Sequence, residues 1–68
     1  MKATIYNRNN NDTEHSIIFL SLTMYASGQE EITVLFDGTE YKAHVYFDGK
    51  GNRSFKHCGK TYDFTIEH

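Results

Sequence analysis

Apolar and polar residues alternate along most of the chain, and glycine-containing turns separate the alternating segments. A period of two is typical of half-buried β-strands, because successive side chains of a strand point to opposite faces of the sheet. The alternation recurs from Leu20 to Ile66. The pattern therefore predicts antiparallel strands joined by short hairpins.

The turns set the predicted pairing of these strands. Gly38-Thr39 and Gly59-Lys60 each have glycine first, as a two-residue type II′ loop prefers. We predict a five-residue loop at 48–52 and a three-residue loop at 27–29, because these lengths keep the apolar positions of neighbouring strands on one face. The predicted pairs include Leu20 with Phe36, Phe36 with Tyr41, Val45 with Phe55, and His57 with Tyr62.

One face of the resulting meander is apolar and must be covered. We expect the sheet of five to six strands to curl into a small barrel, which a strand at residues 3–6 helps to close. The predicted fold class is all-β, with residues 1–68 as a single domain, because a chain this short has room for one core. The predicted inward-facing residues are Leu20, Leu22, Met24, Ile32, Val34, Phe36, Tyr41, Ala43, Val45, Phe47, Phe55, Tyr62, Phe64 and Ile66.

Residues 13–26 also fit an alternative, a helix that would make the fold α+β. Asp12 would be its N-cap, and Ile17, Leu20 and Met24 would share one side. The β-branched and aromatic residues between positions 16 and 23 weakly favour a strand instead. The strand is the first prediction, and the helix remains the alternative.

The cysteine content and the apolar segments indicate where the protein works. Cys58 is the single cysteine of the 68 residues, so no internal disulfide can form. This suits a reducing compartment. The longest apolar run, residues 17–20, is far shorter than the ~20 residues of a membrane span. We expect a cytoplasmic protein without membrane association.

The charge is unevenly distributed along the chain. The net charge of −2 at pH 7 disfavours a general nucleic-acid binder. Residues 30–40 contain four carboxylates and no Lys or Arg, whereas residues 50–60 contain four cations and no carboxylate. The folded domain should therefore have opposed acidic and basic regions, which can steer a charged partner.

The residues that could carry chemistry form no recognised catalytic or metal-binding pattern. The histidines and Cys58 lack the spacings of common metal sites, and His57 and Cys58 should point to opposite faces of a strand. A sheet this small also leaves little room for a water-excluding pocket. We expect no enzyme activity, no bound metal and no cofactor.

The polar face of the predicted sheet carries residues that suit binding. Aromatic side chains are enriched in interface hot spots and also stack on nucleic-acid bases. Lysine and arginine supply the contacts to phosphate groups in nucleic-acid complexes. The predicted binding residues are Tyr25, Leu35, Lys42, His44, Tyr46, Arg53 and Lys56.

Two functional hypotheses follow. The first is a small non-catalytic protein-binding module, an inhibitor or accessory protein that acts by occupying a partner's surface. The alternative is single-stranded nucleic-acid binding by a small OB-like barrel, with Tyr25 and Tyr46 stacking on bases and Lys42, Lys56 and Arg53 binding phosphates. We also expect a homodimer, because six short strands would cover the apolar face incompletely.

Overall fold

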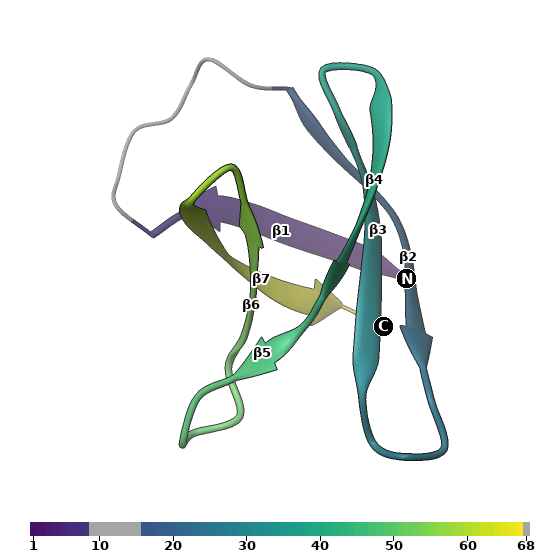
Figure 1. The fold of residues 1–68 in the computed structure, drawn as a ribbon, viewed down its shortest axis with the longest axis vertical. Helices are drawn as coiled ribbons and strands as arrows, with labels where there is room; N and C mark the ends of the chain where they lie inside the picture. Colours follow the sequence, from purple (N-terminus) through teal and green to yellow (C-terminus); the bar gives the residue numbers. More distant parts are fainter. Residues whose placement is uncertain (9–15, 68) are drawn as a thin grey trace.

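The computed structural model describes residues 1–8 and 16–67, which form strands joined by turns (Figure 1). The all-β prediction is confirmed for these residues. The helix alternative for residues 13–26 is wrong where the structure describes that range, and its first three residues lie outside the description. The strands are β1 (Lys2–Asn7), β2 (Ile17–Met24), β3 (Glu30–Phe36), β4 (Thr39–His44), β5 (Tyr46–Phe47), β6 (Arg53–His57) and β7 (Lys60–Glu67).

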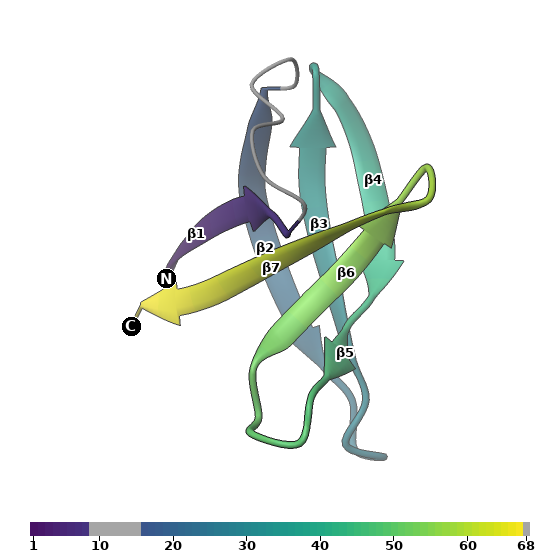
Figure 2. The ribbon, with the colours of Figure 1, turned by 90° about the vertical axis from the view of Figure 1, so that its left-hand side faces the viewer.

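The strands form two antiparallel sheets, with the orders β1-β7-β6-β5 and β2-β3-β4. In Figure 2, β6 and β7 cross in front of β2, β3 and β4 at a steep angle. The chain passes from one sheet to the other at Val45, between β4 and β5. The Val45 N–H donates a hydrogen bond to the Glu30 carbonyl of β3 at 3.0 Å. One bent segment therefore joins the two sheets.

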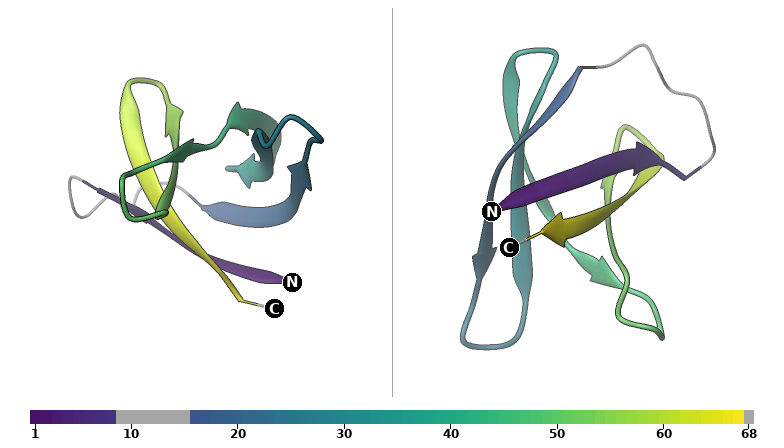
Figure 3. Two further views of the ribbon diagram at one scale, coloured as in Figure 1. Left: turned by 90° about the horizontal axis from the view of Figure 1, so that it is seen from below. Right: turned by 180° about the vertical axis from the view of Figure 1, so that it is seen from behind.

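The first strand lies beside the last, and both termini lie on the same side of the molecule (Figure 3). β1 pairs with β7 from Lys2 opposite Glu67 to Asn7 opposite Tyr62. β1 and β2 are not hydrogen-bonded neighbours, so the described strands form no closed barrel. The predicted closure is therefore not confirmed. The described residues contain no helix long and apolar enough to cross a membrane.

Both two-residue turns lie one position earlier than predicted. Asp37-Gly38 has φ angles of 51° and 86°, and Cys58-Gly59 has φ angles of 49° and 78°. Positive φ at both central positions is the requirement of a type I′ turn, which suits the twist of a hairpin. Phe36 consequently pairs with Thr39 instead of Tyr41. A shift of two residues keeps each side chain on its predicted face.

A β-bulge in β2 reverses the faces of the first half of that strand. The pairing with β3 shifts between Phe19 and Ser21, which leaves Leu20 as the extra residue. Phe19 and Ile17 therefore pack against the core, while Leu20 is exposed. The prediction that Leu20 faces inward is wrong. Ile17 lies opposite Phe36, where Leu20 was predicted to lie.

The core lies between the two sheets, and its buried members are all among the predicted inward-facing residues. Aromatic contacts dominate it, for example Phe36 against Tyr62 at 5.3 Å between ring centroids. Met24 and Phe47 are 58% and 46% exposed, contrary to prediction, because each is the last residue of its strand. The buried core residues are Ile32, Val34, Phe36, Val45, Phe55, Tyr62 and Phe64.

Replacing Gly38 by alanine should destabilise the domain by about 1–2 kcal/mol, because a residue with a Cβ is strained in the left-handed region. A Cβ on Gly38 would meet no atom within 4 Å, so the backbone alone accounts for the loss. Gly49 is the control, since it has equal space and no positive φ. Gly49→Ala should change the free energy of unfolding by less than about 0.5 kcal/mol. Equal losses in urea unfolding would contradict the turn assignment.

Candidate functional site

The predicted binding residues other than Arg53 lie on the outer side of the molecule, along β2–β3–β4 and onward to β5 and β6. Leu35 lies toward one end of this face, with Ile18 and Glu40 as its cross-strand partners. Lys42 lies near the middle, opposite Thr33. The remaining four gather at the other end, where Glu31 joins them. We call this group the aromatic band; it consists of Tyr25, Glu31, His44, Tyr46 and Lys56.

The members of the aromatic band are neighbours in a continuous series. The Tyr25 hydroxyl donates to Glu31 Oε1 at 3.3 Å, and Glu31 is the cross-strand partner of His44. The His44 ring meets the Tyr46 ring edge-on, with centroids 4.9 Å apart. The Lys56 Nζ lies 5.4 Å from the centroid of the Tyr46 ring, within the range of a cation–π contact. The band therefore links β3 to β6 across both sheets.

The bend at Val45 explains why His44 and Tyr46 are neighbours. Val45 is buried in the core, so the residues before and after it both point outward. The corrected register then places His44 beside Glu31, whereas the predicted register placed Tyr46 there. Tyr25 and Tyr46 remain about half exposed and present their rings to solvent.

Arg53 is the predicted binding residue that lies away from the band. Its guanidinium donates to both carboxylate oxygens of Glu30, with Nε–Oε1 2.8 Å and Nη2–Oε2 3.2 Å. The two side chains are 28% and 10% exposed. The hydrogen bonds that it donates to Glu30 raise the pKa of Arg53 above its ordinary value. This pair connects β3 of one sheet to β6 of the other, a role that the sequence did not indicate.

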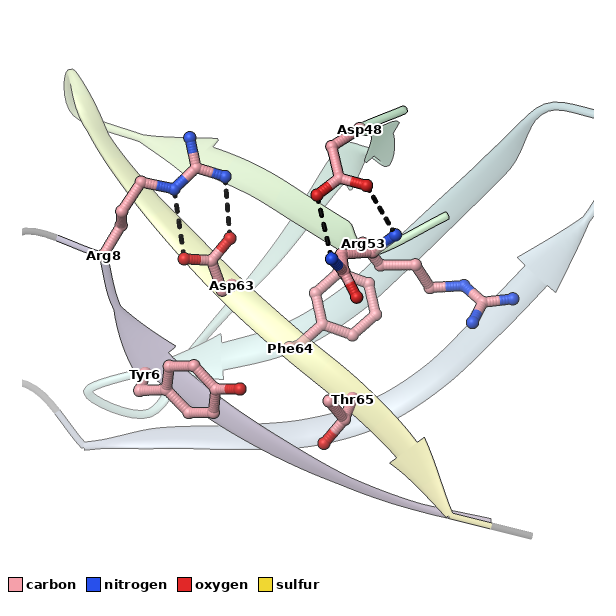
Figure 4. Close-up of a pocket in the computed structure, with 8 residues that line it drawn as sticks. Tyr6, Arg8, Asp48, Arg53, Asp63, Phe64 and Thr65 are labelled. Carbon is pink, nitrogen blue, oxygen red and sulfur yellow. Dashed lines mark hydrogen bonds and ion pairs between the residues drawn. The ribbon is translucent and has the colours of Figure 1, made fainter. Parts of the chain in front are cut away.

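A second surface feature is an open groove of about 500 Å³ beside β7 (Figure 4). Arg8 binds both carboxylate oxygens of Asp63, at 2.7 and 3.1 Å, and this pairing raises the pKa of Arg8. Arg53 points away from that pair (Figure 4). The charged groups of the groove are satisfied by protein partners. The lining residues are Tyr6, Arg8, Asp48, Asn52, Arg53, Asp63, Phe64 and Thr65.

His57 and Cys58 lie closer together than the strand pattern implied. Cys58 has a φ of 49° in the turn, so its side chain does not alternate with that of His57, and the Sγ and Nε2 atoms are 3.9 Å apart. The His57 ring stacks on Phe36, with centroids 3.9 Å apart. The predicted opposite orientation of these two side chains is therefore corrected. Within residues 1–8 and 16–67, no group of three or more His, Cys, Asp or Glu side chains could hold a metal ion.

Comparison with known proteins identifies no relative. No protein-family model, no curated protein and no solved structure matches the chain.

The pair formed by Glu30 and Arg53 should contribute to stability. Glu30→Gln and Arg53→Met should each lower the free energy of unfolding by about 1–3 kcal/mol, because each removes one charge of a partly buried ion pair and leaves the other without its counter-charge. In a double-mutant cycle measured by urea unfolding, the double variant should lose about 1–2 kcal/mol less than the sum. Asp63→Asn, which weakens the more exposed pair with Arg8, should have a smaller effect. Strictly additive losses would rule out the coupling.

Asp48 should titrate below the usual range of an aspartate. The Asn52 side-chain amide and the backbone N–H groups of Asn52 and Lys50 donate to its carboxylate, and these hydrogen bonds lower its pKa. Because the folded pKa is lower than the unfolded one, this contribution to stability is complete above the unfolded pKa and is lost as the pH falls through the folded pKa.

Asn52→Ala removes one of these donors and should raise the pKa of Asp48 toward its ordinary value. Carbon-detected NMR titration of the carboxyl group measures the change. Thr65→Ala lines the same groove and serves as the control, with no expected effect on this pKa. An unchanged pKa in Asn52→Ala would show that the amide does not stabilise the carboxylate.

Proposed function

We propose that this protein is a small non-catalytic binding module whose aromatic band docks on the surface of a partner protein. It would act as an inhibitor or accessory protein by occupying that surface. The observation that carries the proposal is the contiguity of the band, in which His44 and Tyr46 lie between the Glu31 carboxylate and the Lys56 ammonium group and Tyr25 extends the band beyond Glu31.

The chemistry of the band supports protein recognition. Tyrosine is among the residues that contribute most to binding at interfaces, because its ring supplies apolar area and its hydroxyl supplies a hydrogen bond. Glu31 and Lys56 at the sides of the band favour one orientation of a charged partner.

The position of the band on strands also supports binding. His44 ends β4, Tyr46 begins β5 and Lys56 lies within β6, so their backbones are held by ladders of hydrogen bonds. A surface that is ordered before binding loses less conformational entropy in the complex. Occupation of a surface requires no catalytic group, metal or cofactor. The exposed free thiol of Cys58 suits the cytoplasmic location that we propose.

Single-stranded nucleic acid is the alternative partner for the same surface. Tyr25 and Tyr46 could stack on bases, with Lys42 and Lys56 near the phosphates. Two observations favour a protein partner. The Arg53 guanidinium is engaged by Glu30, and the Glu31 carboxylate lies within the band, where it would repel a phosphate backbone. The OB-like form of this alternative would also require β1 and β2 to close into a barrel.

Tyr46→Ala should reduce capture of the partner at least about tenfold, because a central aromatic residue of an interface typically contributes more than 1 kcal/mol. Immobilised wild-type and variant proteins are exposed to lysate of the source organism, with and without nuclease, and the captured protein is quantified by mass spectrometry. Tyr6→Ala is the matched control, since Tyr6 is 50% exposed and Tyr46 is 47% exposed. Tyr6 lies on β1, away from the band.

The proposal requires capture that survives nuclease, persists in Tyr6→Ala and falls in Tyr46→Ala. Equal capture by both variants would show that the band is not the docking surface. Capture that disappears after nuclease treatment would instead favour the nucleic-acid alternative. That alternative predicts oligonucleotide binding that weakens steeply with salt.

A further inference from the structure

The aromatic band carries opposite charges on the two sides of His44. On one side, Tyr25 bonds to the Glu31 carboxylate. On the other side, the Lys56 ammonium group lies over the ring of Tyr46. Tyr25 lies beyond Glu31, so the Glu31 carboxylate and the Lys56 ammonium group flank the pair formed by His44 and Tyr46.

This arrangement is complementary to itself. A two-fold axis that lies in the plane of the contact, between His44 and Tyr46 and perpendicular to the length of the band, places the acidic half of one molecule against the basic half of another. We propose that the aromatic band binds the aromatic band of a second copy of this chain, forming a symmetric dimer. Glu31 then faces Lys56 of the partner subunit, and Lys56 faces Glu31 of the partner subunit.

The symmetry of the contact strengthens this inference. In a two-fold interface the same surface is used on both subunits, so each favourable pair occurs twice. Opposite charges meet at both pairs, while the Tyr46 ring of each subunit supplies apolar area between them. The charges of the surrounding residues are distributed in the same direction as those of the band, from acidic to basic. The acidic residues 30–40 lie on β3 and β4 with the turn between them, and the basic residues 50–60 lie on and around β6.

The size of the band determines the expected affinity. A stable interface commonly buries about 800 Å² on each partner, which is more than five surface residues on a small domain provide. The dimer should therefore be weak and depend on protein concentration. The inference rests on the proposed function, because it names a partner for the same surface. Dimerisation and docking on another protein would then exclude each other.

Sedimentation velocity of the full chain, across a range of concentrations and at low and high salt, tests the dimer. The wild type should dimerise at high concentration and less readily at high salt, because salt screens the two charge pairs. Glu31→Lys and Lys56→Glu should each raise the dissociation constant at least about tenfold, because each variant brings like charges together twice. Glu40→Lys is the control for Glu31→Lys, since it makes the same change of charge outside the band.

Exchange of the charges gives the decisive comparison. The double variant Glu31→Lys/Lys56→Glu should dimerise again, because the two-fold axis still brings opposite charges together. An equimolar mixture of the two single variants should form a mixed dimer for the same reason. Far-UV circular dichroism and thermal unfolding of each variant establish that it is folded. A variant that fails to fold is replaced by Glu31→Gln or Lys56→Gln, each of which should weaken the dimer less.

Three results would overturn the inference. The first is a monomeric wild type at the highest concentration. The second is a dimer that is insensitive to both charge reversals, and the third is a double variant that stays monomeric although folded. The lysate experiment separates this failure from that of the proposed function. If the protein is monomeric but still captures a partner through Tyr46, the dimer is ruled out and the proposed function stands. If the dimer depends on the two charges but capture does not depend on Tyr46, the dimer stands and the proposed function is ruled out.

Discussion

The bend of the chain at Val45 is the constraint on which the rest of the structure depends. A short meander with one apolar face can bury that face by folding into two sheets that pack on each other. The segment from β4 to β5 passes from one sheet to the other. The buried side chain of Val45 and its hydrogen bond to the Glu30 carbonyl hold this junction. The Glu30 carboxylate binds Arg53 of the opposite sheet. Backbone and side chain of Glu30 thus secure the same corner.

The bend also determines what the surface presents. A residue that points into the core at a corner leaves its two neighbours on the outside, and the turning backbone brings their rings together. His44 and Tyr46 meet in this way, and Glu31 and Lys56 flank them from the adjoining strands. Core packing and the candidate site are therefore consequences of one local change of direction.

The sequence could predict which residues face the core because alternation along a strand is insensitive to a shift of two residues in its pairing. The turn at Asp37-Gly38 illustrates this, since placing it one residue late moved every pair and left the core unchanged. Asp-Gly is itself a signal for a type I′ turn, whereas Cys-Gly is not. The outer surface depends on the pairing itself, so the neighbour of Glu31 was predicted incorrectly. Nothing in the uninterrupted alternation around Val45 indicates the passage between sheets.

The bulge at Leu20 affects how this domain should be compared with others. All residues of β2 except Leu20 have a partner on β3, so the pairing would be the same if position 20 were missing. The residue changes the length of the strand and not its pairing. An alignment of this chain with another meander should therefore match residues by the side of the sheet on which they lie, with a one-residue gap permitted at position 20. Without that gap, Ile17 and Phe19 would be scored as solvent-facing positions.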